Sequence, residues 1–414
     1  MGKPTEGLHP DTIAIRSGYD AAMGGMSAKP PLYLTSTFGY GSAQQAKDIH
    51  QAFFDGTGPE AGGEGLIYAR LGHPNLTMVE TRLAAFDGAE AACVFNSGMA
   101  ASTAIALAFL KPGDSVVYTR PIYGGTDGLL GKLLARFGVA SAVCLNGCSE
   151  AAMAAAISEA SGKGRLRAIW VETPANPTAA LVDLAMVVRL AATLPDRPLT
   201  VCDNTLLGPV MQRPHDFGID LVMTSLTKYA GGHSDLLAGG VSGSAALMRE
   251  LVAVRTTLGS HLDPFTAWLL LRSMETVGLR MERASANADR LARWLRDHPK
   301  VTGITYLGFV AEGTPEHAVF QRQCKGAGST FSFRITGGEA EAFRLLDALR
   351  LVTLAVSIGG TETLITHPAS TTHYSVDRAA REAAGVTDST IRLSVGIEHV
   401  DDLIADFAQA LETI

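Results

Sequence analysis

The 414-residue sequence predicts an α/β protein: a mostly parallel seven-stranded sheet domain covered by helices, then a smaller α+β domain. From about Ala91 onward, short apolar runs alternate with segments of helical period, which is typical of parallel strands joined by helices. After Pro264 the pattern becomes strongly helical before strands and helices mix. The composition, with 47% hydrophobic and 18% charged residues, is that of a globular chain with a large core.

The expected strands of the first domain are short apolar runs bounded by polar residues or glycine. They are Ala92–Phe95, Ser115–Tyr118, Ala140–Leu145, Ala168–Glu172, Leu199–Asp203, Leu221–Ser225 and Gly239–Ser242. Between the first two, Met99–Leu110 is rich in Ala, Leu and Ile and stops at Lys111-Pro112-Gly113, which predicts a helix. Upstream, apolar residues at helical spacing over residues 76–86 predict another helix that closes at Gly88.

Three parts are expected along the chain: an extended arm (residues 1–65), a large domain (66–262) and a C-terminal α+β domain (263–414). The arm follows from glycines between Gly24 and Gly65 and from Pro30-Pro31, which indicate loops. The helix Arg280–Asp297 is interpreted as the bridge to the second domain. That domain is expected to contain the strands Thr330–Arg334 and Ile391–Ser394 and the helices Glu339–Leu351 and Val400–Thr413.

Charge and cysteine content narrow the class of protein. The net charge of −7 and the pI near 5.9 argue against a nucleic-acid or anionic-membrane partner and favour an enzyme with a small-molecule substrate. Five scattered cysteines are typical of a reduced, cytoplasmic protein, and we expect no metal site, because Cys144 and Cys148 lack further ligands at zinc spacing. The first residues, Met1–Glu6, contain no apolar signal core, and no uninterrupted apolar segment reaches the length of a membrane span, so secretion and membrane insertion are not expected.

The segment from Ser225 to Asp235 carries the strongest functional signal. An apolar run leads into it and glycines follow, so Lys228 is expected where a buried strand ends. A partly desolvated lysine has a lowered pKa and can form a Schiff base. Ser225 and Thr227 lie two residues apart, so on an extended strand their hydroxyls would face one anion. The segment is therefore interpreted as an attachment site for pyridoxal 5′-phosphate (PLP).

Other strand ends offer partners for that cofactor. Asp203 closes an apolar strand, where it suits a pyridinium nitrogen or, alternatively, a helix N-cap. The turn Asn96–Met99 opens a helix whose N-terminus favours a phosphate. Tyr123 stands at the next junction, either stacked on a flat ring or lying over the core.

Asn176 and Arg392 are further candidates for contacts in the site. The prolines that flank Asn176 stiffen its loop, which could present its amide to the cofactor's 3′-oxygen. Arg392 lies in an apolar strand and needs an anionic partner, either a structural carboxylate or the substrate's carboxylate.

Together these residues resemble the Cys/Met-metabolism family of PLP enzymes, which includes cystathionine γ-synthase, cystathionine lyases, methionine γ-lyase and homoserine-ester sulfhydrylases. The resemblance runs from Leu34-Thr35-Ser36-Thr37-Phe38 through the Lys228 segment to Arg392-Leu393-Ser394-Val395-Gly396-Ile397-Glu398. It implies the aspartate-aminotransferase-like fold (fold type I) and PLP as the cofactor. It also implies a homodimer with shared active sites, assembled as a homotetramer.

The resemblance assigns roles residue by residue. Lys228 is the Schiff-base lysine, Asp203 pairs with the pyridinium, and Tyr123 stacks on the ring and moves protons. The residues implied to hold the phosphate are Gly98, Met99, Ser225, Thr227 and, from the neighbouring subunit, Tyr68 and Arg70. The residues implied to line the substrate's amino-acid end are Arg392, Ser357 and Asn176, the last also facing the cofactor.

Three departures from the family pattern bear on the reaction. His73-Pro74-Asn75 replaces Asn-Pro-Thr, and Gly125 stands where methionine γ-lyases carry cysteine. The block Ala355–Ser370 looks most like methionine γ-lyase, whereas Thr371 is closer to the sulfhydrylases.

The expected reaction is γ-elimination on a sulfur-containing L-amino acid, which gives a 2-oxo acid, ammonia and a thiol. The alternatives are γ-replacement on an O-acylhomoserine and a PLP-binding protein without turnover.

Overall fold

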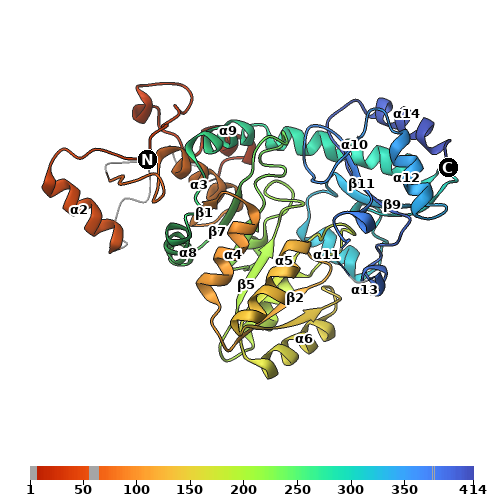
Figure 1. The fold of residues 1–414 in the computed structure, drawn as a ribbon, viewed down its shortest axis with the longest axis horizontal. Helices are drawn as coiled ribbons and strands as arrows, with labels where there is room; N and C mark the ends of the chain where they lie inside the picture. The colour runs from red at the N-terminus through yellow and green to blue at the C-terminus, as the bar shows by residue number, and fades with distance from the viewer. Residues whose placement is uncertain (1–6, 56–64, 375, 377) are drawn as a thin grey trace.

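The computed structural model describes residues 7–55, 65–374, 376 and 378–414. It contains two sheets, a seven-stranded one and a five-stranded one, and the long helix α10 (Val277–Arg296) runs between them (Figure 1). The chain therefore has the α/β architecture with a smaller sheet domain that the sequence predicts.

The large sheet has the strand order β1-β7-β6-β5-β4-β2-β3. Its strands are β1 (Ala91–Phe95), β2 (Asp114–Thr119), β3 (Ala140–Cys144), β4 (Arg165–Glu172), β5 (Leu199–Asp203), β6 (Leu221–Thr224) and β7 (Gly239–Gly243). Among the described strands of this sheet, β7 alone runs opposite to the others. All the predicted strands of this domain are confirmed, because strands buried on both faces are the continuous apolar runs that a sequence shows plainly.

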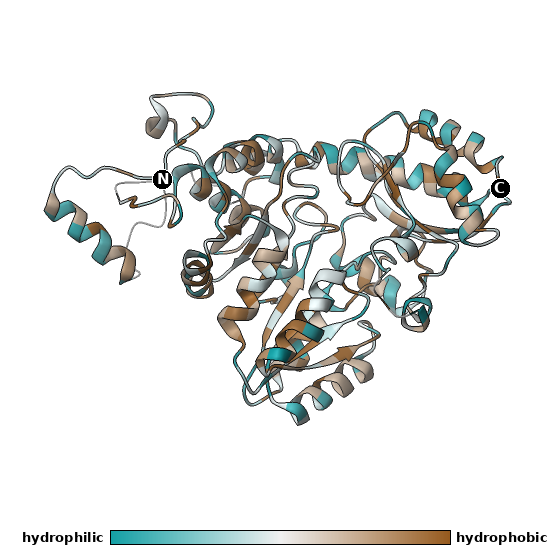
Figure 2. Cartoon of the chain, in the orientation of Figure 1, coloured by the Kyte–Doolittle hydropathy of each residue, from teal (hydrophilic) through white to brown (hydrophobic). Residues whose placement is uncertain are grey.

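Helices cover both faces of this sheet. On one side α4 (Gly98–Phe109) and α8 (Ala245–Leu258) pack on the strands, and on the other side α6 (Glu150–Lys163) and α7 (Leu184–Ala192) do so. Figure 2 shows hydrophobic strands between helices of mixed hydropathy. No helix in the described ranges is both long and apolar enough to cross a membrane.

The remaining helices of the large domain flank the sheet edge and connect the strands. They are α3 (Pro74–Asp87), α5 (Gly124–Gly128), α9 (Pro264–Met274), the π-helical turn Leu129–Leu133 and the 3-10 turns Leu134–Phe137 and Pro214–Phe217. α9 shares a hydrophobic cluster with α3. The division at residues 262 and 263 stays a prediction. Helix α10 contributes Met281 to the same cluster and Leu291 to the cluster of the C-terminal domain, which favours a boundary inside α10.

The C-terminal sheet has the strand order β10-β11-β12-β9-β8. Its elements are β8 (Val301–Thr305), α11 (Pro315–Gln323), β9 (Thr330–Ile335), α12 (Glu339–Ala348), β10 (Thr353–Leu354), β11 (Leu364–Thr366), α13 (Arg378–Ala383), β12 (Thr390–Ser394), α14 (Val400–Leu411) and the 3-10 turns Leu307–Phe309 and Pro368–Ser370. Helices α10, α12 and α14 bury their apolar faces on the sheet. The predicted helices and strands of this region are confirmed, whereas the short or half-exposed β8, β10 and β11 were missed.

The N-terminal segment differs from the expectation of an extended arm with loops. Helices α1 (Pro10–Arg16) and α2 (Ala43–Phe54) and a 3-10 turn (Ala21–Gly24) form within it. Each helix has its own cap, since the side chains of His9 and Ser42 accept from Asp11 N and Gln45 N. The glycines Gly56, Gly58 and Gly62-Gly63, which supported the loop prediction, lie outside the described residues.

The departure His73-Pro74-Asn75 anchors this segment to the large domain. His73 caps α3 through a hydrogen bond from Leu76 N. Asn75 accepts from Tyr33 N at 2.9 Å and donates to Pro31 O at 2.9 Å. These residues therefore fix where the N-terminal segment leaves the body of the protein.

Candidate active site

The candidate site residues meet where the parallel strands of the large sheet end. Tyr123 follows β2, Glu172 ends β4, Asp203 ends β5, and Lys228 follows β6. Loops at the carboxyl ends of parallel strands open on the same edge of a sheet. The C-terminal domain brings Ser357 and Arg392 to this edge, so both domains contribute to the site.

Lys228 is held in a turn just beyond β6. Its Nζ donates to Ser357 Oγ at 2.8 Å. Burial and the nearby Arg392 lower the pKa of the Lys228 amine, while Asp203 opposes the shift. The amine is thus shifted toward the neutral form that Schiff-base chemistry requires, as the sequence predicted.

Ser357 sits in a conformation that is uncommon for its residue type. Its φ is 101°, a region that L side chains rarely adopt. From this position its side chain accepts from Lys228 and its carbonyl oxygen accepts from Arg392 Nη2 at 2.7 Å. The strained backbone of Ser357 therefore allows one residue to contact both Lys228 and Arg392.

Asp203 is buried and bonds through one carboxylate oxygen. Thr205 donates to Asp203 Oδ1 from its N at 3.0 Å and from its Oγ1 at 2.6 Å. Both bonds use Oδ1, so Asp203 Oδ2 has no hydrogen bond from these Thr205 donors. Burial raises the pKa of Asp203 to about 6, while the Thr205 bonds and Lys228 lower it. The N-cap alternative does not apply, because Asp203 precedes turns and no helix begins there.

Glu172 is a second buried carboxyl group beside Asp203, and no role was assigned to it from the sequence. The two residues are register partners on β4 and β5. Glu172 Oε2 accepts from Tyr123 N at 2.6 Å, and Oε1 accepts from Asn176 N at 2.9 Å. Burial and Asp203 raise the pKa of Glu172 to about 8. The signal that pointed to Asp203, an acidic residue closing an apolar strand, was also present at Glu172.

Gly98 and Ser225 approach each other closely at the N-terminus of α4. A Cβ on Gly98 would lie 3.1 Å from Ser225 Cβ and Oγ. Ser225 N donates to Thr205 Oγ1 at 2.9 Å, which links this region to Asp203. The first amides of a helix have no acceptor within it, so those of Gly98 and Met99 are available beside the Ser225 hydroxyl.

The expected geometry of Thr227 is wrong. Strand β6 ends at Thr224, and Ser225 to Thr227 lie in a turn, so their hydroxyls do not share the face of an extended strand. Thr227 Oγ1 donates to Ala238 O at 3.1 Å and accepts from Ala238 N at 3.0 Å. The glycine-containing turn bends the backbone sooner than an apolar run indicates.

The Tyr123 side chain is 49% exposed, so it does not lie over the core. Its ring approaches Met99 across Gly125, where a Cβ would lie 2.7 Å from Tyr123 Cε1 and 2.8 Å from Met99 Sδ. The absence of a side chain at Gly125 therefore sets where the Tyr123 ring rests.

Arg392 is 2% exposed and contacts neutral acceptors only, among the described residues. Its Nη1 donates to Asn176 Oδ1 at 3.3 Å, and its Nη2 donates to Ser357 O. Burial lowers the pKa of Arg392 to about 10. Its Nε is buried without a partner in that part of the chain. The structural-carboxylate alternative for Arg392 finds no partner in the described chain.

Tyr68 and Arg70 are not brought to this site within one chain. Both are exposed, Tyr68 by 43%. Arg70 Nη1 donates to Thr256 O at 2.8 Å and its guanidinium lies 5.9 Å from the Tyr68 ring centroid. They form no hydrogen bond to Lys228, Asp203 or Ser225 in the described chain.

Arg280 supports the Lys228 loop and was also missed from the sequence. It is buried on α10 and donates to Tyr229 O at 2.7 Å and to Ser273 O at 2.8 Å. Only the tertiary structure brings it to the loop, because 51 residues separate it from Tyr229.

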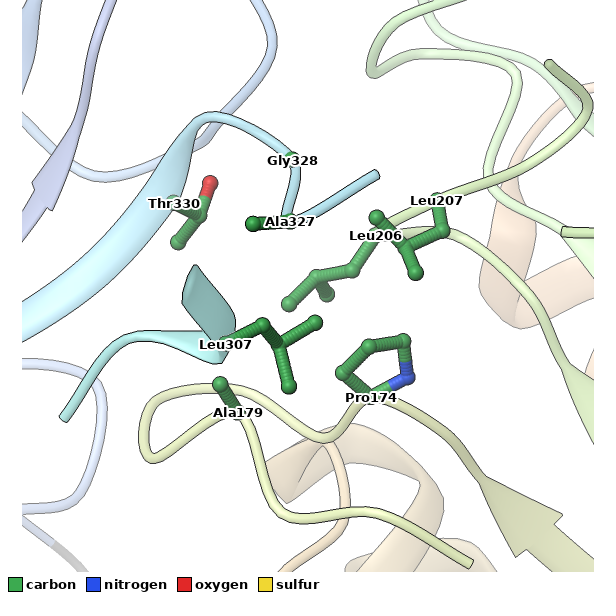
Figure 3. A pocket seen from close by; sticks show the side chains of 8 residues that line it. All are labelled: Pro174, Ala179, Leu206, Leu207, Leu307, Ala327, Gly328 and Thr330. Atoms are coloured by element: carbon green, nitrogen blue, oxygen red, sulfur yellow. The ribbon is translucent and has the colours of Figure 1, made fainter. Parts of the chain in front are cut away.

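A small apolar crevice lies beside the Asn176 loop at the junction of the two domains (Figure 3). Pro174, Ala179 and Leu206 line it from the large domain, and Leu307 and Ala327 from the C-terminal domain. Residues of both domains line it, and none of them is charged. The crevice is therefore no candidate for the chemistry.

The donor set fits PLP. Asp203 lies beside a second buried carboxyl group, Glu172, and a cationic ring N–H there would offset the cost of burying negative charge. The amides at the start of α4 and the Ser225 hydroxyl suit a phosphate. Among the described residues no group of His, Cys, Asp and Glu could hold a metal ion.

Comparisons with known proteins agree with this geometry. A family model described as Cys/Met metabolism PLP-dependent enzyme matches residues 11–412. An L-methionine γ-lyase of Fusobacterium nucleatum subsp. polymorphum is 39% identical, covering 97% of this chain and 98% of its own. An O-succinylhomoserine sulfhydrylase of Pseudomonas aeruginosa is 36% identical over 99% and 96% of the two chains. The crystal structure of a cystathionine γ-synthase from Xanthomonas oryzae pv. oryzae has a TM-score of 0.87 and 34% identity, covering 98% of each chain.

Proposed function

Because the chain belongs to the Cys/Met metabolism family of PLP-dependent enzymes, we propose that it performs γ-elimination on a sulfur-containing L-amino acid. The products are a 2-oxo acid, ammonia and a thiol. The observation that carries the choice of reaction is that L-methionine γ-lyases share 36–39% of their residues with nearly the whole chain. The cofactor itself follows from the family.

The substrate's carboxylate binds to Arg392 in this proposal. A buried guanidinium that meets only Asn176 Oδ1 and Ser357 O has donor capacity left for an anion. A carboxylate can accept two parallel N–H bonds from such a group, which fixes the orientation of the amino acid. This anchor directs the substrate's α-carbon toward the Lys228 side of the site.

Lys228 and Tyr123 move the protons. Bound PLP supplies a carbonyl for the covalent bond and a ring that stabilises negative charge on the substrate. The Lys228 amine, shifted toward its neutral form and held by Ser357 Oγ, can take the proton from the substrate's Cα and return it to a neighbouring carbon. The exposed Tyr123 hydroxyl handles the proton of the leaving thiol.

Asp203, Gly98, Met99, Ser225 and Thr227 hold the cofactor in this proposal. Asp203 Oδ2 takes the ring nitrogen, and the first amides of α4 with the Ser225 hydroxyl take the phosphate. Thr227 contributes chiefly by fixing the turn through its bonds to Ala238.

Gamma-replacement on an O-acylhomoserine is the second candidate. It is favoured by the similarity to an O-succinylhomoserine sulfhydrylase and a cystathionine γ-synthase, and by Thr371. Thr371 Oγ1 bonds to Thr366 Oγ1 at 2.9 Å and to His367 O at 2.7 Å, so a small polar side chain is accommodated at that position.

A product screen separates these reactions. The enzyme is incubated with L-methionine, L-cystathionine or an acylhomoserine, with and without an added thiol, and 2-oxobutanoate and thioether are quantified. We expect the oxo acid to dominate. Thioether as the main product, with negligible oxo acid from every substrate, would establish replacement instead, and no turnover of any substrate would leave a PLP-binding protein.

We also propose that the active site is shared in a homodimer, and that two dimers form a homotetramer. Tyr68 and Arg70 are exposed in the single chain, as are Met26, Leu34 and Phe54 of the N-terminal segment by 74–77%. Burial of this segment against a partner chain would remove these apolar side chains from water.

Free cysteines, three of them buried, support placing the enzyme in the reducing cytoplasm.

Mixed oligomers test the sharing of sites. An Arg70→Ala subunit paired with a Lys228→Ala subunit forms one intact site if the two residues come from different chains. The mixed oligomers should therefore be more active than either variant alone. Hybrid dimers demonstrated by mass spectrometry but without activity would exclude a shared site.

A further inference from the structure

The buried carboxyl group of Glu172 lies at the end of the middle one of three neighbouring strands. In the sheet order, β4 lies between β5 and β2. Glu172 ends β4, its register partner Asp203 ends β5, and Tyr123 follows β2. Since the three ends open on one edge, a side chain at the end of the middle strand can reach the loops of both neighbours.

Both oxygens of Glu172 are used, each by a different loop. Oε2 accepts from Tyr123 N at 2.6 Å, and Oε1 accepts from Asn176 N at 2.9 Å. Glu172 itself is 3% exposed, so water does not compete strongly for these bonds. Its own N donates to Thr119 Oγ1 at 3.3 Å, which ties its backbone to β2.

We propose that Glu172 is a positioning residue that fixes the Tyr123 loop and the Asn176 loop in one mutual geometry. Tyr123 faces the cofactor ring in the proposed function, and Asn176 accepts from Arg392, which binds the substrate's carboxylate. One side chain thus sets the distance between the ring-stacking group and the carboxylate anchor. The inference rests on the proposed function for the roles of Tyr123 and Arg392, but not for the contacts of Glu172.

A carboxyl group suits this task better than an amide. Both groups that face Glu172 are N–H donors, and a carboxyl group has one oxygen for each of them. A glutamine offers one oxygen and one NH2, so one backbone N–H loses its acceptor. An aspartate keeps the carboxyl group but is shorter by one methylene, so it cannot span both loops.

Asp406 provides a matched control in the C-terminal domain. It is also a buried carboxylate that accepts backbone N–H donors, from Arg350, Leu351 and Val352 at 2.8–3.0 Å. It lies on α14, and none of its hydrogen bonds in the described chain reaches a site residue. Asp406→Asn therefore makes the same replacement of a carboxyl group by an amide, and it costs stability without touching the two site loops.

Hydrogen exchange measured by mass spectrometry tests the contacts directly, with and without PLP. We expect Glu172→Gln and Glu172→Asp to raise the exchange rates of peptides that contain residues 122–126 and 175–180 roughly tenfold or more, because a lost hydrogen bond makes local opening easier. Asp406→Asn should raise exchange near residues 350–352 only. Unchanged exchange in both site loops would overturn the proposal whatever the reaction proves to be.

Kinetics and the cofactor's visible absorption test the consequence. Both Glu172 variants should lower kcat/KM by roughly ten- to a hundredfold, the effect of misplaced reacting groups, and should shift the absorption band of bound PLP. Asp406→Asn should leave both unchanged. A Glu172→Asp enzyme with wild-type kinetics beside an impaired Glu172→Gln enzyme would overturn positioning, because a carboxyl group of either length would then suffice. If Glu172→Gln fails to fold, Glu172→Asp carries the test.

Discussion

The large sheet buries a carboxyl group of raised pKa near each of its two ends. Asp203 lies at the carboxyl end of the parallel strands, and Asp87, at the end of α3, contacts Ser242 at the opposite end. Burial raises the pKa of each to about 6. In degree of burial and in pKa the two groups are nearly alike.

Their surroundings differ. Asp87 Oδ2 accepts from Ser242 Oγ at 2.6 Å, and His215 Nε2 lies 3.0 Å from the same hydroxyl. His215 Nδ1 in turn lies 2.9 Å from Ile219 O, and Asp87 Oδ1 is buried without a partner in the described chain. Asp203, by contrast, lies at the sheet edge where β2, β4 and β6 also end, with Lys228 nearby, and Arg392 of the other domain reaches the same edge through Asn176 and Ser357. A shifted pKa or an unpaired buried oxygen therefore marks burial, and the convergence of an amine, a guanidinium and several strand ends marks the candidate site.

Removing Lys228 should produce the largest difference between the two ends. In Lys228→Ala the covalent bond to PLP and the proton-transfer amine are both lost, so turnover should fall by at least about a thousandfold. Oxo-acid release and borohydride trapping of the cofactor check this, with circular dichroism as the control for folding. If the variant kept its activity and still formed a covalent PLP adduct on borohydride reduction, the assignment would be contradicted.

Arg392→Lys should have the next largest effect. A lysine keeps the charge but loses the two-pronged contact, so kcat/KM should fall roughly ten- to a hundredfold, as expected for a charge-assisted bond worth about 1.5–3 kcal/mol. The matched control is Arg334→Lys, on the exposed side of the neighbouring strand β9. Equal kinetics of the two variants would remove Arg392 from the site.

Gly125→Ala should have a smaller effect, about tenfold on kcat, because the added Cβ displaces the Tyr123 ring or Met99. Gly128→Ala, in the same helix and with open space at its Cβ, is the control. If both variants match the wild type, the position of the Tyr123 ring does not limit turnover.

Asp87→Asn should leave kcat/KM within about twofold of wild type and should change the pH dependence of stability instead. The folded pKa of Asp87 is raised by burial from 3.8 to about 6, against the pull of Ser242, His215 and Arg213. Its contribution to stability is thus fully present below about pH 4 and is lost as pH rises to about 6.

Urea unfolding of both proteins across this range measures that loss. The free energy of unfolding of the wild type relative to Asp87→Asn should fall with pH, by up to about 1.4 kcal/mol per pH unit. A relative stability that rises over the same range would show that the native carboxylate, not the acid, is favoured.

Local chemistry allowed the sequence to reveal the strands of the large sheet and the candidate residues Lys228 and Asp203. Buried parallel strands are apolar runs, and a charged residue that closes such a run stands out against it. Glu172 gave the same signal and was passed over. The half-exposed strand β8 and the short β10 gave a weaker one, because an edge strand or a two-residue strand has too few buried positions to establish a period.

Tertiary structure alone decided which of these residues meet. Lys228 and Ser357 are 129 residues apart, and Asn176 and Arg392 are 216 apart. The order of the strands places Glu172 between two loops, and the turn after Thr224 directs Thr227 toward Ala238. Periodicity and composition are local properties, whereas strand order and the docking of two domains depend on the packing of the whole chain. The sequence by itself therefore determined the fold class and the kind of chemistry, and the tertiary structure determined the geometry in which that chemistry is held.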